Sequence, residues 1–152
     1  MRTIVPGSNT YIHTLIAYIQ CHHIYCRLAN GFGPESIVAI YKSHVTSEAF
    51  ATEACHALVN MLASETDDLI PRMAAAGLAA LALRSLRKCP NSETLSRWAF
   101  QALYYISCDP KLAPKLITGD VLDLISMQLE QHAGNEGMVH TYTLNEALLS
   151  FD

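Results

Sequence analysis

The side chains best suited to nucleophilic chemistry stand in the segment ACHALVNML, residues 54–62. Cys55 lies next to His56, and Asn60 follows four residues later. A cysteine nucleophile, a histidine that takes up its proton and an asparagine that orients the imidazole form a known type of catalytic site. The spacing does not favour this chemistry on a helix, because neighbouring side chains point about 100° apart and Cys55 would not face His56.

A second cluster, CHHIYC at residues 21–26, contains four residues of the types that bind zinc. On a helix Cys21 and Cys26 would point about 140° apart. No Cys-x-x-Cys pair that could complete a tetrahedral site occurs elsewhere in the sequence. We therefore expect no metal and no other cofactor. A helical metal-binding protein that uses Cys21, His22, His23 and Cys26 is the alternative.

The composition limits the classes of protein to which this chain can belong. Its 152 residues are 51% hydrophobic and 16% charged, which is enough apolar material for one compact domain. The net charge of −4 and the lack of a basic run argue against a nucleic-acid partner. The five cysteines are odd in number and irregularly spaced, unlike a secreted disulfide framework. We therefore expect an intracellular, cytoplasmic protein with reduced thiols.

The N-terminal region raises the question of a membrane segment. Residues 3–26 contain no Asp, Glu, Lys or Arg, and this length could cross a bilayer. The same stretch contains Pro6, Gly7, Asn9 and several histidines, which are poorly suited to a hydrocarbon environment. We interpret it as a buried helix of a soluble protein rather than a signal or transmembrane segment, and we expect no membrane insertion.

The elements that would position these residues repeat along the chain. An Ala-Leu pair recurs at a spacing of 45 residues, as Ala57-Leu58, Ala102-Leu103 and Ala147-Leu148. The segments 69–86 and 112–129 also match each other, with apolar residues at positions i, i+3, i+4 and i+8. This spacing produces the apolar face of a helix. A period near 45 residues is typical of solenoids built from helical repeats.

Each repeat unit is predicted to contain a short helix, a glycine that breaks it, a second helix, a polar turn and a long third helix. The breaking glycines are Gly31, Gly77 and Gly119. Ser47 and Ser92 are expected to cap the third helices, because a hydroxyl can accept a hydrogen bond from an unpaired backbone N–H. No segment alternates with the period of a strand, so the predicted fold class is all-α.

The repeat register divides the single domain, residues 1–152, into a partial repeat at 1–22 and repeats at about 23–64, 65–109 and 110–152. Each third helix should bury its positions i, i+4 and i+7 between neighbouring repeats. In the first two third helices these positions are Ala54, Leu58, Met61, Ala99, Leu103 and Ile106. Stacked units then share one continuous core, which a single unit could not form.

The repeated segments resemble the armadillo repeat family. EACHALVNML, residues 53–62, is similar to the third helix of an armadillo repeat, whose family pattern approximates Trp-Ala-Leu-x-Asn-Ile. AAAGLAALALRSL, residues 74–86, resembles the segment that precedes this helix. The resemblance covers about two full repeats and partial repeats at both ends, and the glycine break favours armadillo over the related HEAT repeats. It implies a right-handed superhelix that serves as a non-enzymatic interaction scaffold.

In this family the third helices line the concave groove of the superhelix, where a partner protein or an extended peptide binds. The resemblance therefore implies a partner-binding groove lined by Glu53, His56, Asn60, Trp98, Gln101, Tyr105, Thr143, Glu146 and Ser150. The Trp of the family pattern is missing from its position in all three copies, and only Asn60 retains the Asn. We expect Trp98 and Tyr105 to anchor a polar and aromatic ligand, although Trp98 could instead pack on the neighbouring repeat.

The repeat register also bears on the possible catalytic pair. The other copies hold Phe100 and Asn145 in place of Cys55, and Gln101 and Glu146 in place of His56. A catalytic pair is not expected at positions where equivalent helices carry such residues. We therefore expect no enzymatic activity, with Cys55 as a small apolar filler of the core and His56 as a polar residue of the groove.

The C-terminal segment should expose apolar surface. Leu144, Leu148 and Phe151 continue the buried stripe of the third copy, with no following repeat to cover them. We expect self-association through this face of the C-terminal repeat, or a chain that is a structural segment of a larger armadillo or HEAT array. Residues 132–138, HAGNEGM, should form the most mobile turn because they contain two glycines and few apolar anchors.

Overall fold

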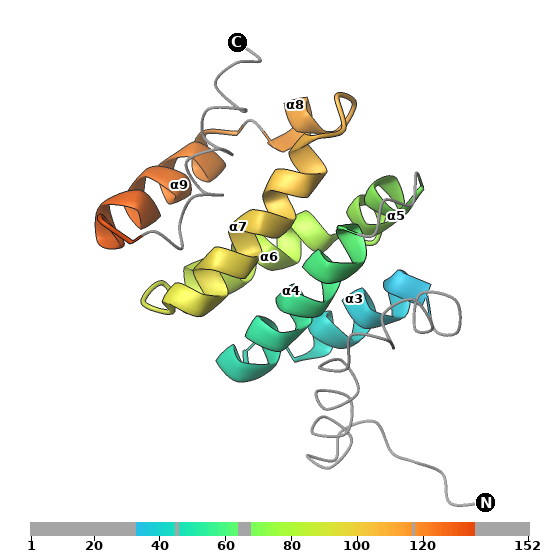
Figure 1. The fold of residues 1–152 in the computed structure, drawn as a ribbon, viewed down its shortest axis with the longest axis horizontal. Coiled ribbons are helices and arrows are strands. Elements are labelled where there is room, and N and C mark those ends of the chain that lie inside the picture. Colours follow the sequence, from blue (N-terminus) through green and yellow to red (C-terminus); the bar gives the residue numbers. More distant parts are fainter. Residues whose placement is uncertain (1–32, 45, 64–67, 117, 136–152) are drawn as a thin grey trace, which may run out of the picture.

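Helices account for most of the residues that the structure describes, and these residues contain no strand (Figure 1). The structure is a computed structural model, and it describes residues 33–44, 46–63, 68–116 and 118–135. The helices are α3 (Gly33–Ser43), α4 (Glu48–Leu62), α5 (Leu69–Ala75), α6 (Leu78–Lys88), α7 (Glu93–Ser107), α8 (Ala113–Leu116) and α9 (Gly119–Gln131). The predicted all-α class is confirmed for this part of the chain.

The two longest helices, α4 and α7, begin at equivalent serines but are capped differently. The Ser47 hydroxyl accepts a hydrogen bond from the Phe50 backbone N–H, at 3.3 Å, as expected for an N-cap. Ser92 has a similar extended backbone conformation before α7, but its side chain makes no capping hydrogen bond. The prediction of a side-chain cap is therefore confirmed at Ser47 and wrong at Ser92.

The break between α5 and α6 depends on a glycine. Gly77 has a φ of 97°, a left-handed conformation that an L side chain adopts only with strain, and the axes of α5 and α6 diverge there by 61°. The predicted break at Gly77 is confirmed. Near Gly119 the predicted break is present, since α8 ends at Leu116 and α9 begins at Gly119, but this glycine is the first residue of the second helix rather than the residue that breaks the chain.

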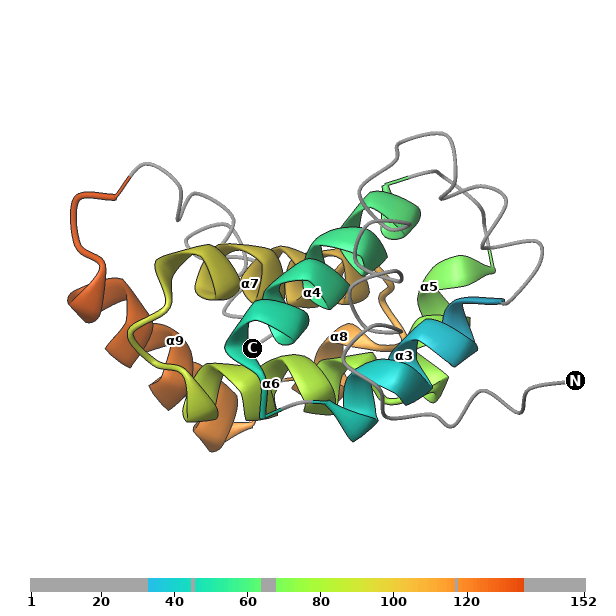
Figure 2. The ribbon, with the colours of Figure 1, turned by 90° about the horizontal axis from the view of Figure 1, so that it is seen from below.

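The helices form two layers (Figure 2). In one layer α4 and α7 lie side by side, and they make the most extensive contact between any two helices of the described residues. The second layer contains α3, α6 and α9, and α7 also packs closely on α6. Helices from neighbouring predicted units therefore lie next to one another: α4 beside α7, and α3 beside α6.

The hydrophobic core is continuous through both layers. All six positions predicted to be buried on the third helices are at most 2% exposed: Ala54, Leu58, Met61, Ala99, Leu103 and Ile106. The second layer contributes Leu78, Leu81 and Leu86 from α6, and Val121, Leu124 and Ile125 from α9. These apolar faces follow the spacing read from the sequence, so burial of apolar surface is the main force that holds the helices together.

Two buried polar clusters join helices within this core. In the first, the Tyr41 hydroxyl of α3 is hydrogen-bonded to the Ser85 hydroxyl of α6 and accepts a hydrogen bond from the Cys55 thiol of α4, at 3.2 Å. In the second, the fully buried Gln128 of α9 accepts a hydrogen bond from Ser96 of α7, at 2.8 Å. Each cluster satisfies polar groups that would be costly to bury alone.

At the surface, α3 and α5 are joined by an ion pair. Arg72 of α5 donates two hydrogen bonds to the Glu35 carboxylate of α3, at 2.7 and 3.0 Å, and lies 3.4 Å from Asp68. This pairing lowers the pKa of Glu35 and raises the pKa of Arg72. Both side chains are more than 40% exposed, so water screens the pair and it contributes little to stability.

No single helix within the described ranges is long and apolar enough to cross a membrane. Helices α5 and α6 together reach the required length and apolar composition, but this pair is sharply bent at Gly77.

Several sequence predictions fall outside the described residues. They concern the partial repeat at 1–22, the glycine Gly31, the cluster at 21–26, the third groove rung at Thr143, Glu146 and Ser150, and the apolar stripe of Leu144, Leu148 and Phe151. Of the turn at 132–138, only residues 132–135 are described.

Candidate functional site

The predicted groove residues of the first two rungs lie on the adjacent helices α4 and α7. We call this surface the α4/α7 strip, and it consists of Glu53, His56, Asn60, Trp98, Gln101 and Tyr105. All six side chains are half-buried. On each helix their spacing of i, i+3 and i+7 places them on one stripe, next to the fully buried stripe that faces the core.

An aromatic stack joins the two helices of the strip. The imidazole of His56 on α4 lies over the indole of Trp98 on α7, with ring centroids 4.0 Å apart and ring planes inclined by 16°. These rings belong to different rungs of the predicted groove, because His56 lies on α4 and Trp98 on α7. They do not stand at equivalent positions, since Gln101, one turn after Trp98, is the residue equivalent to His56. The stack therefore holds Trp98 in place and fills part of the space between α4 and α7.

The indole also attracts Arg97, a cation that was not among the predicted groove residues. The guanidinium carbon of Arg97 lies 4.9 Å from the centre of the Trp98 ring, within the range of a cation–π interaction. Arg97 is exposed. Its position immediately before Trp98 was visible in the sequence, but only the structure shows that the side chain bends back over the neighbouring ring.

The tyrosine end of the strip is partly packed. The rings of Tyr104 and Tyr105 are 6.0 Å apart and inclined by 58°, and both lie against the core while remaining half-exposed. The pKa of Tyr104 is raised, first by electrostatic repulsion from the neighbouring Cys108 and then by partial burial of the ring. Tyr104 is therefore in part a packing residue. Trp98 and Tyr105 lie against the core and remain partly exposed. Packing of Trp98 on the neighbouring helix is confirmed by its contact with His56, while its role as an anchor for a ligand stays a prediction.

Cys55 and His56 point in different directions, as the helical spacing predicted. The thiol is fully buried and donates to the Tyr41 hydroxyl, while His56 stacks on Trp98. Burial raises the pKa of the Cys55 thiol to about 12, although the hydrogen bond between the thiol and the Tyr41 hydroxyl opposes this shift. At neutral pH the thiol is therefore protonated and inaccessible, which makes it unsuited to nucleophilic attack.

The strip offers hydrogen bonding and aromatic contact rather than reactive groups. Asn60 and Gln101 carry amides that can both donate and accept, and Tyr105 adds a hydroxyl. Within the described ranges no group of three or more His, Cys, Asp or Glu side chains could hold a metal ion.

Comparisons of this chain with protein-family models, with curated proteins and with solved structures found no match.

Proposed function

We propose that this protein is an armadillo-like solenoid that acts as a non-enzymatic scaffold and binds an extended protein segment along the α4/α7 strip. The observation that carries the proposal is the alignment of the two equivalent third helices. Helices α4 and α7 stand at the same place in units spaced by 45 residues, and they pack side by side with their half-buried polar and aromatic residues on one surface.

The arrangement of neighbouring helices supports the solenoid. In a stack of three-helix units, each helix lies next to its equivalent in the following unit. The contact of α4 with α7 and that of α3 with α6 both follow this rule. The apolar face of α9 continues the second layer, because Val121, Leu124 and Ile125 join the same core. Right-handed superhelical stacking of the units is the arrangement that we propose for the whole chain.

The chemistry of the strip supports an extended ligand. Packed helices lie about 10 Å apart, and an extended chain advances roughly 3.3 Å for each residue. One rung would therefore meet about every third residue of the ligand. Side-chain amides at Asn60 and Gln101 can pair with peptide groups, and the accessible edges of Trp98 and Tyr105 can bind aromatic or apolar side chains.

The charge of the strip favours a ligand without a strong net charge. Glu53 is the acidic group of the strip, and Arg97 places a basic group over the ring of Trp98. Such a balanced lining gives little electrostatic preference for a basic or an acidic peptide. We therefore propose a polar and aromatic segment as the ligand.

The test is selection of ligands from a displayed library of random peptides, followed by titration of a selected peptide against variants of the full chain. We expect Trp98→Ala to weaken binding by about 2 kcal/mol or more, the usual threshold of a hot spot. His56→Ala should weaken binding as well, because Trp98 loses the ring that holds it in place.

Met127→Ala is the matched control, because it removes an exposed apolar side chain from the other layer and should leave binding unchanged. Thermal melting of each variant separates a lost contact from a lost fold. If Trp98→Ala melts like the wild type and binds the selected peptides equally well, the proposed function is wrong.

A further inference from the structure

Two neighbouring helices of the second layer carry opposite charges on their exposed surfaces. Helix α6 contains three basic residues and no acidic residue, and all three are exposed: Arg84, Arg87 and Lys88. Helix α9 contains three acidic residues and no basic residue, and all three are exposed: Asp120, Asp123 and Glu130. We call the surface formed by these six residues, Leu124 and Met127 the α6/α9 face. It belongs to a different layer from the α4/α7 strip.

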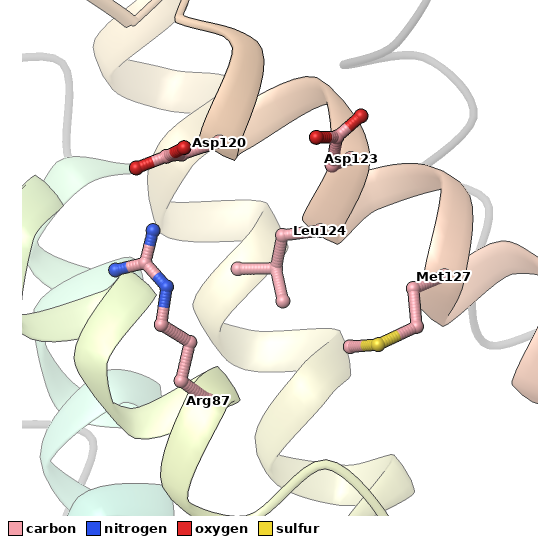
Figure 3. Close-up of a pocket in the computed structure, with 5 residues that line it drawn as sticks. All are labelled: Arg87, Asp120, Asp123, Leu124 and Met127. Atoms are coloured by element: carbon pink, nitrogen blue, oxygen red, sulfur yellow. The ribbon is translucent and has the colours of Figure 1, made fainter.

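A shallow pocket of about 370 Å³ lies at the centre of this face, where α6 and α9 meet (Figure 3). Arg87 extends from α6 toward Asp120, while Asp123 points outward from α9 and away from Arg87. Among the described residues the ion pairs closer than 4.0 Å all involve Arg72, so Arg87 has no such pair with either aspartate. The charges around the pocket are therefore available to a second molecule.

The pocket also has an apolar part. The buried Leu124 and the side chain of Met127 line it on the α9 side. Met127 is 44% exposed and is the large hydrophobic residue that stands out at the surface of the described chain. Methionine is flexible and adapts to irregular cavities, which makes it common at protein-binding surfaces. An exposed methionine beside a cavity that it could fill indicates an interface with an apolar centre.

We propose that the α6/α9 face binds a second copy of this chain across a two-fold axis. A two-fold interface brings the same surface together from both copies, so it must be complementary to itself. Adjacent basic and acidic helices meet this requirement, because α6 of one protomer then lies on α9 of its partner, and the reverse. Arg87 of each protomer faces Asp123 of its partner, and each Met127 enters the pocket of the other protomer.

The size of the face predicts a weak dimer. Helices of 11 and 13 residues are about 16 and 20 Å long, and packed helices are about 10 Å apart. The face therefore covers roughly 400 Å² on each protomer, against about 800 Å² in a stable interface of standard size. Exposed charges contribute through attraction that salt screens. The dimer should form only at high protein concentration and should weaken as salt is added. This inference does not depend on the proposed function of the strip.

The first measurement is sedimentation equilibrium of the full chain at increasing concentration, in low and in high salt. We expect the apparent mass to rise from 16.7 kDa toward twice that value in low salt, and to rise less in high salt. A chain that stays monomeric over the whole concentration range overturns the proposal. An association that does not respond to salt also overturns it.

A charge exchange then tests which residues meet. Arg87→Glu places two acidic groups opposite each other, and Asp123→Arg places two basic groups opposite each other, so each variant alone should associate about tenfold more weakly or worse. An equal mixture of the two variants restores both attractive pairs across the axis, and we expect it to associate like the wild type. A mixture can recover the lost association only if Arg87 and Asp123 meet between different protomers, so recovery shows that the contact is intermolecular.

Lys42→Glu is the matched control, since it makes the same change of charge at an exposed position of α3 and should associate like the wild type. Thermal melting checks that all variants are folded. If the two variants associate as the wild type does, the dimer uses another surface, such as the α4/α7 strip or the C-terminal repeat, and the proposal is wrong. Failure of the mixture to recover association also overturns it.

Discussion

Cys55 illustrates how burial decides the behaviour of a single side chain. Its sequence neighbours suggested a nucleophile, yet its environment keeps the thiol neutral. Both Cys55 and the Tyr41 hydroxyl that accepts its hydrogen bond are fully buried, and burial raises the pKa of each group. Ionising either group would place an unpaired negative charge in the apolar core, which is strongly unfavourable. The cluster of Tyr41, Cys55 and Ser85 therefore joins three helices only while its groups are protonated.

This raised pKa predicts a loss of stability at alkaline pH. The pKa of Cys55 rises from 9.0 to about 12 in the folded chain, so the folded state holds the proton more tightly than the unfolded state. The stabilisation is complete below pH 9 and is lost as pH rises from 9 to about 12, by up to about 1.4 kcal/mol per pH unit. Cys55→Ser keeps a hydroxyl donor for Tyr41 but does not titrate in this range.

Urea unfolding of the wild type and of Cys55→Ser at a series of pH values checks this prediction. We expect the unfolding free energy of the variant to fall less steeply above pH 9 than that of the wild type. Tyr41 still titrates in the variant, so a smaller decline should remain. Equal slopes in the two proteins would mean that Cys55 does not contribute to the alkaline loss.

At the scale of the element, the two third helices differ in how they begin. The equivalent residues Ser47 and Ser92 have nearly the same backbone conformation, with φ and ψ of −89° and 111° against −83° and 98°. Only Ser47 pairs with a backbone N–H of its helix. An N-cap side chain stabilises a helix only when it makes this hydrogen bond, so identical residues at equivalent positions should contribute unequally.

A pair of alanine substitutions separates the two caps. Ser47→Ala removes a hydrogen bond to the first turn of α4 and should lower the unfolding free energy by about 1 kcal/mol. Ser92→Ala removes no capping bond and should change it by less than about 0.5 kcal/mol. Chemical denaturation of both variants and the wild type gives the comparison. Equal losses would contradict the difference in capping between α4 and α7.

At the scale of the whole molecule, α9 is attached to the other helices through a few specific contacts. Its apolar residues Val121, Leu124 and Ile125 join the core, but its backbone lies close to the other helices at few points. Gln128 completes the attachment, since its amide receives a hydrogen bond from Ser96 and donates one to the Pro90 carbonyl, at 3.1 Å. A unit held in this way can open without unfolding its neighbours.

Gln128→Ala should therefore loosen α9 selectively. The substitution leaves the Ser96 hydroxyl and the Pro90 carbonyl without their partner, at a cost of about 1–3 kcal/mol. Hydrogen exchange of the amides in α9 should become faster, while exchange in α4 stays unchanged. Gln131→Ala is the control, because this exposed residue bonds to Asn91 at the surface and should matter little. Equal acceleration in α4 and α9 would show that the molecule opens as one unit.

The sequence by itself determined the helices and the composition of their buried faces. The spacing of Ala54, Leu58 and Met61, and the matching set around Leu103, follow from the 3.6-residue turn of a helix, which is a local property. The break at Gly77 is equally local, since it depends on the conformational freedom of one residue. For these features the periodic pattern was sufficient, and the structure confirmed them.

Only the tertiary structure decided which side chains of different helices meet. The stack of His56 on Trp98 and the bond between Tyr41 and Ser85 join residues that lie far apart in the sequence. The pocket between α6 and α9 likewise brings opposite charges from distant segments to one face. A repeat spacing places helices side by side, but it does not fix their rotation or their shift along the axis. Those depend on how whole apolar faces interlock, and a shift of a single turn would bring together different polar residues.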